Sequence, residues 1–366
     1  MVEDLQIDRY NRSDLKKLIS DPSYLDESTY PISPQRAESL INNPRAEDED
    51  ILLITARKNG RVIAYRTAMP DHVFHGEKKI RYAWICGSWV HPEWRRKRLA
   101  TKLFLLLSEA WNKHLTYTNY APISKRLYDK TQVFEEYCHH DGQRFYIRFN
   151  AATILPGHYP WLRSFRGPLR LLDACLNTLL RPFMVSRIDC PQYTSSSWSD
   201  LNWAEAQAFF RDTLCARGEK EFEWILKYPW VIDAEEGKGL KGERYFFSWI
   251  AHPFRRRLLS FENNGRTNHI LISQKDGQLK IPYMDVDEYG WEKAARVILT
   301  EAQKCGLSEV DSYQEKLLRH MLSLSKAYIT TKKHERKYMV SKHISDDFPK
   351  LNSIQVPDGE GDVVFI

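Results

Sequence analysis

Four consecutive cations, Arg95 to Arg98, are the first residues whose types and spacing suggest chemistry. The aromatic and β-branched residues of 82–90 predict a buried strand before them, and Pro92 ends that strand because it lacks a backbone donor. Leucines from Leu103 onward at spacings of three and four residues predict a helix after them. The first amides of a helix have no partner within the helix and lie at the positive end of its dipole. The pattern therefore predicts a phosphate-binding loop, with a solvated basic surface as the simpler alternative.

The spacing of this stretch is more specific than its charge. Val-x-Pro-x-x-Arg-Arg-x-x-Leu-Ala resembles the acyl-CoA-binding signature of the GCN5-related N-acetyltransferase (GNAT) superfamily, in which loop amides hold the CoA pyrophosphate. Arg95 and Ala100 match that signature, whereas Arg98 stands where the family usually has glycine. The resemblance implies that the cosubstrate, acetyl-CoA or another acyl-CoA, is bound by Trp89, Val90, Arg95, Arg96, Lys97, Arg98, Leu99 and Ala100. The amides at Trp89 and Val90 would polarise the thioester carbonyl.

A second stretch, residues 121–130, resembles the last motif of the same family. Ser124 and Tyr128 match it, and Ala121 stands where an asparagine is expected. The resemblance implies that Ser124 contacts the cosubstrate and that Tyr128 is a general acid for the departing CoA thiolate. A tyrosine packed on its helix is the alternative. The general base stays open among five residues: Asp71, His72 and His75, which are predicted to lie in a loop between strands, Ser88 in the strand over 82–90, and Glu93 just past it.

The chain is long enough for about two domains, since domains usually have 100–200 residues. Helical patterns over 14–20 and 34–41, a hairpin at Asn59-Gly60 and the strand–loop–helix above follow the element order of an acetyltransferase domain. We predict an α+β fold of two tandem GNAT-like domains, each a mixed central sheet flanked by helices. The domains are 1–150, which binds acyl-CoA, a connector over 151–195 with an amphipathic helix, and a degenerate domain over 196–366.

The second half is predicted to repeat the element order without the phosphate loop. Residues 290–304 read as its main helix, 193–200 as a loop and 358–366 as a last strand. Asp285, Asp287 and Glu288 stand where the loop would be, and carboxylates repel pyrophosphate.

Residues 156–187 contain several prolines, with leucines and arginines between them. They predict a helix packed between two halves, or alternatively a basic amphipathic segment lying on anionic lipid. We favour the packed helix and expect no membrane partner.

Composition narrows the function further. The formal charge of +6 is mild and does not indicate nucleic acid, and six scattered cysteines predict a reducing compartment and no metal site. Without an apolar run of 18 residues, a cytoplasmic protein is expected. We predict an N-acyltransferase in which an amine-bearing small molecule or peptide attacks the thioester directly, with a homodimer as an open option. The alternative is a non-catalytic GNAT-like module that binds a ligand or partner, which Arg98 and Ala121 favour.

Overall fold

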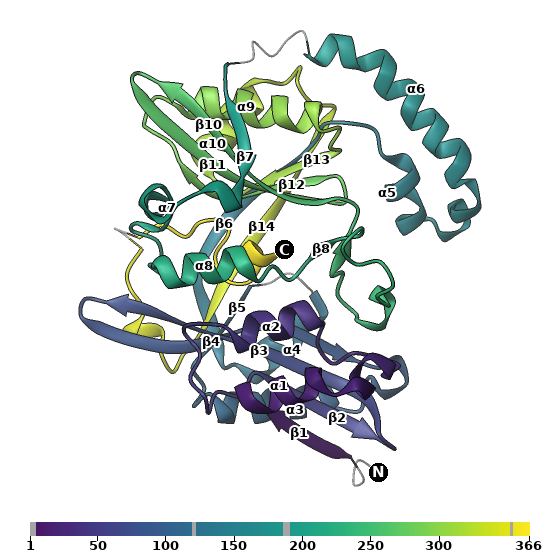
Figure 1. Ribbon diagram of the computed structural model, residues 1–366, viewed down its shortest axis with the longest axis vertical. Helices are drawn as coiled ribbons and strands as arrows, with labels where there is room; N and C mark the ends of the chain where they lie inside the picture. Colours follow the sequence, from purple (N-terminus) through teal and green to yellow (C-terminus); the bar gives the residue numbers. More distant parts are fainter. Residues whose placement is uncertain (1–4, 119–121, 186–190, 352–353) are drawn as a thin grey trace. The chain divides into compact units, whose positions relative to one another are not determined.

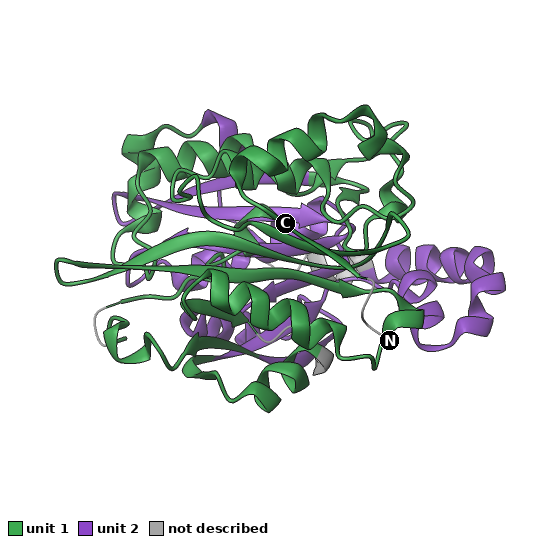
Figure 2. Ribbon diagram, turned by 90° about the horizontal axis from the view of Figure 1, so that it is seen from below, with its two compact units in different colours: residues 1–139, 201–254, 336–366 green, residues 140–200, 255–335 purple. Residues whose placement is uncertain are grey.

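The computed structural model describes residues 5–118, 122–185, 191–351 and 354–366. They form two compact units, shown in different colours in Figure 2. Unit 1 comprises Met1–His139, Leu201–Phe254 and Arg336–Ile366, and unit 2 comprises His140–Asp200 and Arg255–Glu335. Each unit takes segments from both halves of the sequence. The compact units therefore do not follow the predicted limits at 150 and 196.

Unit 1 is built on a mixed sheet in the strand order β1-β2-β3-β4-β5-β14 (Figure 1). The strands β1 to β4 are antiparallel neighbours, whereas β5 runs parallel to β4. The strands are β1 (Gln6–Tyr10), β2 (Leu53–Lys58), β3 (Arg61–His75), β4 (Lys78–Val90), β5 (Leu115–Thr118) and β14 (Thr330–Ser341). A pair of two-residue strands, β8 (Ile232–Asp233) and β9 (Ile250–Ala251), lies apart from this sheet.

Helices cover both faces of the unit 1 sheet (Figure 2). They are α1 (Arg12–Ser20), α2 (Pro34–Ile41), α3 (Leu99–Ala110), α4 (Pro122–Thr131), α7 (Trp203–Phe210) and α8 (Glu219–Lys227). The Ser33 side chain accepts from the amide of Arg36 at the start of α2, so the predicted cap is confirmed. Phe104 and Leu107 of α3 are buried against apolar residues of β2 to β5. This packing fixes where α3 begins relative to the end of β4.

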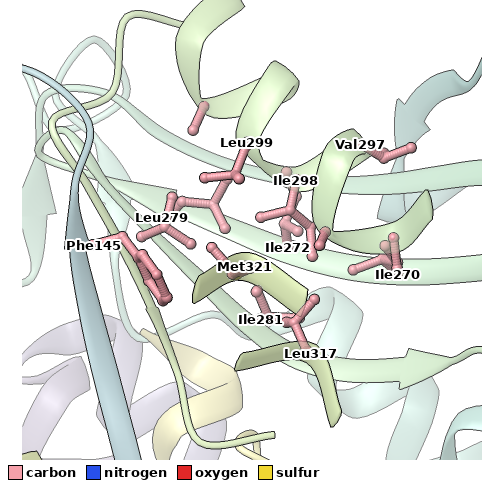
Figure 3. Packing of buried hydrophobic residues seen from close by; sticks show 14 of the residues in the cluster. Phe145, Ile270, Ile272, Leu279, Ile281, Val297, Ile298, Leu299, Leu317 and Met321 are labelled. Carbon is pink, nitrogen blue, oxygen red and sulfur yellow. The ribbon is translucent and has the colours of Figure 1, made fainter. Parts of the chain in front are cut away.

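The strands of unit 2 follow one another in the order β6-β13-β12-β11-β10-β7, and β6 belongs to this unit from His140 onward. Its apolar core lies between these strands and the helices α9 and α10 (Figure 3). The elements are β6 (Phe134–Tyr146), α5 (Ala151–His158), α6 (Arg166–Val185), β7 (Thr194–Ser197), β10 (Phe254–Asn263), β11 (Arg266–Lys275), β12 (Gln278–Asp285), α9 (Trp291–Lys304), β13 (Glu309–Ser312) and α10 (Glu315–Ser323). The predicted fold class, a mixed sheet with flanking helices, is thus confirmed in both units.

The two units repeat one topology. Three antiparallel strands are followed by a helix, a strand parallel to the third, and a second helix: β2-β3-β4-α3-β5-α4 in unit 1 and β10-β11-β12-α9-β13-α10 in unit 2. The strand that comes next in the chain then pairs within the other unit. After α4, β6 pairs with β13, and after α10, β14 pairs with β5. This exchange is why each unit contains segments of both halves.

Three local predictions are wrong. Residues 193–200 contain the edge strand β7 and a 3₁₀ turn rather than a loop. The predicted final strand over 358–366 consists of turns and a 3₁₀ helix, because Glu360 is buried beside Arg217 and Gly361 has a left-handed backbone against Trp84. Strand β3 continues to His75, so Asp71 and His72 lie in a strand and not in a loop. Among the described helices, none is long and apolar enough to span a membrane.

Candidate anion-binding site

The predicted phosphate loop connects the end of β4 to the start of α3. A 3₁₀ turn over Pro92–Trp94 leads to Arg95, which has an extended backbone and donates from Nε to the Val90 carbonyl at 3.2 Å. Arg96 and Arg98 have positive φ angles of 63° and 59°, and Lys97 between them does not. Left-handed residues that alternate with right-handed ones turn successive amides toward one side, which makes an anion-binding concavity. The loop therefore has the backbone of an anion-binding nest.

The amides of this nest are available to a ligand. Among the residues that the structure describes, none accepts a hydrogen bond from the backbone amides of residues 96–101. The first bond of α3 runs from the Lys102 amide to the Arg98 carbonyl, and no side chain caps the helix. The side chains of Arg95, Arg96, Lys97 and Arg98 are exposed, so Arg98 does not cover the amides from within the fold. Six consecutive donors thus stand at the positive end of a twelve-residue helix.

The end of β4 leads into this nest along an open strand edge. Strand β4 pairs with β3 along its length but with β5 only at Ala83 and Trp84. The amide of His91 donates to the Ile63 carbonyl on the β3 side. Because backbone groups alternate in direction along a strand, the amides of Ser88 and Val90 point away from β3. Among the described residues, they face the part of the β4 edge that β5 does not pair, whereas the amide of Trp89, predicted as a donor to the thioester, points toward β3.

Arg66 of β3 connects the loop to Tyr128, although the sequence analysis did not single it out. Its side chain is 1% exposed and donates to the Tyr128 hydroxyl at 2.7 Å and to the Ala100 carbonyl at 3.4 Å. Within the described part of the chain, no carboxylate pairs with this guanidinium, and its Nε has no hydrogen-bond partner. Since Tyr128 accepts from Arg66, its own proton remains available to another acceptor. Arg66 thereby holds Tyr128 next to the first turn of α3.

The other predicted site residues take different positions. Trp89 stacks on Tyr65 with ring centroids 5.6 Å apart, and Leu99 is buried under α3. Ser124 is half-buried in the first turn of α4 and makes no described contact with the nest, and Ala121 lies outside the described residues. Ser88 is the residue directly opposite Arg66 in the β3–β4 register, so both side chains are on the same face of the sheet.

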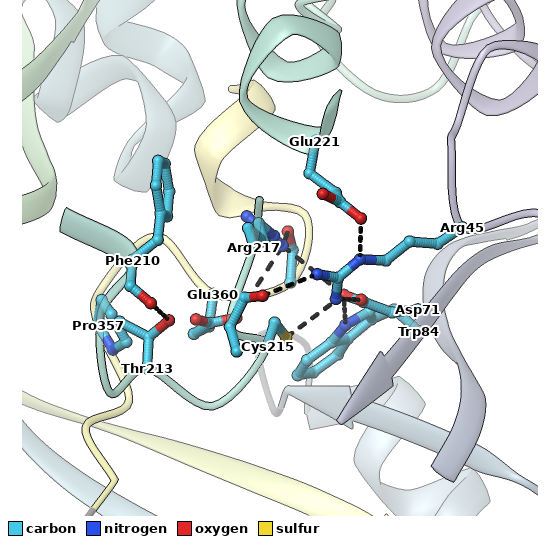
Figure 4. Close-up of polar contacts among 12 residues, drawn as sticks. Arg45, Asp71, Trp84, Phe210, Thr213, Cys215, Arg217, Glu221, Pro357 and Glu360 are labelled. Atoms are coloured by element: carbon cyan, nitrogen blue, oxygen red, sulfur yellow. Dashed lines mark hydrogen bonds and ion pairs between the residues drawn. The ribbon is translucent and has the colours of Figure 1, made fainter. Parts of the chain in front are cut away.

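Asp71 belongs to a second polar cluster, which is buried in unit 1 (Figure 4). Its carboxylate lies 2.6 Å from Arg45 and 3.7 Å from Arg217 and also accepts from the Trp84 indole at 3.1 Å. Arg45 in turn contacts Glu221 at 2.9 Å. Since these groups come from segments up to 176 residues apart, the cluster joins distant parts of the chain.

Burial and the ion pairs within this cluster determine which of its side chains are charged. Burial opposes ionisation of Asp71, but Arg45 and Arg217 hold the pKa of its carboxyl below the usual value. Burial, followed by the charge of Arg45, lowers the pKa of His72 to about 4. Burial raises the pKa of Glu360. Asp71 is thus an anion with two cationic partners, and His72 is neutral near pH 7, which fits a structural role better than proton transfer.

The other candidate bases are not gathered at the nest. His75 lies at the exposed end of β3, where its Nδ1 is 2.9 Å from the Asp347 carbonyl, and Glu93 is exposed in the turn after β4. Ser88 lies directly opposite Arg66 in the β3–β4 register, whereas His72 lies on the same sheet face six residues further along β3.

Unit 2 has no equivalent of the nest at the corresponding helix. At the start of α9, Asp287 accepts from the amide of Tyr289 at 2.8 Å and from the side-chain amide of Asn263 at 3.1 Å. These hydrogen bonds lower the pKa of Asp287, although its slight burial works in the opposite direction. A carboxylate therefore occupies the place where a phosphate would need free amides.

The structure is thus an α+β protein in which a loop of unpartnered amides precedes a helix. Residues 14–132 match the model of the acetyltransferase (GNAT) family. The matched segment includes the nest and Tyr128. No curated protein matches the chain.

Several solved structures are similar to the chain over most of its length. A GCN5-related N-acetyltransferase from Kribbella flavida has 12% identity and a TM-score of 0.43, over 92% of this chain and 71% of that one. A putative acetyltransferase from Pyrococcus horikoshii has 14% identity and a TM-score of 0.46, over 93% and 90%. The N-myristoyltransferase of Saccharomyces cerevisiae with bound myristoyl-CoA has 10% identity and a TM-score of 0.47, over 93% and 83%.

Proposed function

We propose that the chain is an acyl-CoA-dependent N-acyltransferase, with acetyl-CoA as the first candidate for the cosubstrate. The observation that carries the proposal is the nest of unpartnered amides at residues 96–101, inside the segment that matches the family. A diphosphate fits this geometry because its oxygens accept several amide hydrogen bonds at once and its charge matches the helix dipole. The exposed side chains of Arg95, Arg96, Lys97 and Arg98 add positive charge around the same place.

In this proposal the reacting thioester lies along the open edge of β4. The outward-pointing amides of Ser88 and Val90 supply donors at the place where charge develops on the thioester oxygen. The nitrogen of an amine, from a small molecule or a peptide, attacks the carbonyl carbon, and the carbon–sulfur bond breaks. The leaving thiolate takes a proton from Tyr128, whose hydroxyl oxygen is held by Arg66, and the proton that the attacking nitrogen loses passes to water, from which Tyr128 is reprotonated. Because a thiolate is a good leaving group, positioning contributes more than acid catalysis.

Calorimetry with acetyl-CoA tests the binding step. We expect micromolar binding to the native chain and none detectable for Arg95→Glu, since the reversal places a carboxylate beside the nest. Lys16→Glu is the matched control: Lys16 is an exposed cation on α1 of the same unit, and its reversal should leave binding unchanged. Absence of heat with every short acyl-CoA would refute the cosubstrate assignment.

Release of free CoA thiol in the presence of mixed amines tests the chemistry. We expect Tyr128→Phe to bind acetyl-CoA normally and to turn over more slowly, most clearly below the pKa of a thiol, where the departing sulfur ends as a protonated thiol. Binding without turnover for any amine would instead favour the non-catalytic ligand-binding module. A cytoplasmic location and a homodimer stay predictions.

A further inference from the structure

Residues 151–185 of unit 2 form a helical arm, in which α6 packs on the short helix α5 (Figure 1). Asp173 of α6 is buried and accepts from the amides of Ala151 and Ala152 at 2.9 Å. Asn177 exchanges two hydrogen bonds of 2.9 Å with the backbone of Phe149. These contacts fix which side of α6 faces its neighbour and therefore which side faces solvent.

The solvent side of the arm is apolar. Leu171, Cys175 and Leu179 follow one another at four-residue spacing and are exposed, with Leu171 at 68% and Leu179 at 67%. The turn before α6 adds exposed Trp161 at 67%. Of the fourteen large apolar side chains that are exposed among the described residues, six lie in this arm: Tyr159, Trp161, Phe165, Leu171, Leu172 and Leu179. The sequence analysis favoured a helix packed between two halves, but these leucines are not packed.

The exposed charged side chains that the structure describes in this arm have a single sign. Arg163, Arg166 and Arg170 are exposed, and none of them forms an ion pair with a residue that the structure describes. Asp173 is the one acidic residue in the sequence from 159 to 180, and it is directed inward. Arg166 and Arg170 stand seven residues before Asp173 and Asn177, so they lie on that side of α6 and the leucines lie on the other. A helix with leucines on one face and arginines on the opposite face is typical of helices that lie in the plane of an anionic membrane surface.

From this surface we propose that the helical arm docks on an anionic lipid bilayer, with α6 lying in the interfacial plane. Aromatic rings such as Trp161 are favoured at the level of the headgroups, and leucines enter the acyl boundary. Anionic headgroups supply the charge that complements Arg163, Arg166 and Arg170, none of which has an ion-pair partner among the described residues. The proposal concerns unit 2 and does not depend on the proposed function.

Flotation of the full chain with vesicles tests the docking. We expect the chain to float with vesicles of phosphatidylcholine and phosphatidylserine, and much less with phosphatidylcholine alone or at high salt. Arg166→Ser and Arg170→Ser should each weaken binding about fivefold, because a basic residue near an anionic surface contributes about 1 kcal/mol. The double variant Leu171→Asp/Leu179→Asp should not float.

Leu322→Asp is the control, because Leu322 is an exposed leucine at 43% on α10 of the same unit and should leave flotation unchanged. Circular dichroism and acetyl-CoA calorimetry check that each variant is folded. The proposal is overturned if the native chain does not float with anionic vesicles, or if the double aspartate variant floats equally well. It is also overturned if light scattering shows a dimer that this variant converts to a monomer while neither binds vesicles.

Discussion

The left-handed backbone of Arg98 makes a prediction about both stability and binding. Arg98 has φ 59° and ψ 11°, directly before the first residue of α3. Glycine adopts this conformation freely, whereas an L-residue meets a steric cost of roughly 1–2 kcal/mol and a β-branched residue meets more. If the nest depends on this geometry, valine at position 98 forces either strain or a turn of the amides away from the ligand.

The expected magnitudes follow from these costs. Arg98 already meets the cost of an L-residue, so Arg98→Val should lower the free energy of unfolding only by the extra cost of the β-branch, about 1 kcal/mol. Arg98→Gly relieves strain of about 1 kcal/mol but makes the unfolded chain more flexible by a comparable amount, so its net change should stay within about 1 kcal/mol. Arg95→Val is the matched control: Arg95 has φ −65° and ψ 157°, where valine is unstrained, so stability should change by less than about 0.5 kcal/mol.

Urea titration of the first unfolding transition and calorimetry with acetyl-CoA measure the two consequences. Arg98→Gly keeps the amides in place and removes one exposed charge, so its affinity should fall by less than about tenfold. Arg98→Val should lose more affinity than Arg98→Gly, because it also disturbs the amides. Equal stability of Arg98→Val and Arg95→Val would refute the left-handed geometry, and loss of binding in the glycine variant alone would refute the role of the amides.

Two further predictions concern the buried cluster of unit 1. Arg45→Met removes the cation shared by Asp71 and Glu221, so the free energy of unfolding in urea should fall by about 3–5 kcal/mol. Arg9→Met, which breaks an exposed pair, should change it by less than about 1 kcal/mol, and equal losses would contradict the burial of the cluster. His72 has a pKa of about 4 when folded and about 6.5 when unfolded, so the unfolded chain binds more protons between these values. Stability should therefore fall by about 2 kcal/mol from about pH 7 to about pH 5, and His72→Phe should remove that part of the slope. An unchanged slope in this variant would show that His72 is not buried as a neutral ring.

The helices, strands and turns around the nest could be predicted from the sequence, because interactions between residues close together in the chain determine them. Ser33 caps α2, and Asn59 and Gly60 have the positive φ angles that a tight hairpin turn requires. The strand–loop–helix over 82–110 was predictable for the same reason, as periodicity changes where β4 ends and α3 begins. The family motif has glycine at the position of Arg98, and glycine readily adopts a left-handed backbone. The motif therefore indicated where the left-handed residue would lie.

Long-range features could not be predicted in this way. Strand β14 is rich in charged residues, so its sequence does not resemble a buried strand, and it forms because Tyr338 to Val340 pair with β5. The exchange of β6 and β14 between units is likewise absent from any local pattern. Arg45 and Asp71 read as surface charges until the fold brings Arg217 and Glu221 to them.

For Arg66, the sequence predicts a position within a strand, but only the fold shows that the side chain is buried. In the sequence it is one charged residue within a strand, which usually marks the solvent face. In the structure it is buried beneath α3, with Phe104 and Tyr128 rings about it at 5.5 and 5.6 Å and no described carboxylate beside it. Burying an unpaired cation is costly, so a site that keeps one gains from a nearby anion. Its contact with the Ala100 carbonyl places this charge at the first turn of α3, where it adds to the helix dipole. The same guanidinium that orients Tyr128 thus strengthens the positive field at the nest, which joins the proposed diphosphate site and the proposed acid through one side chain.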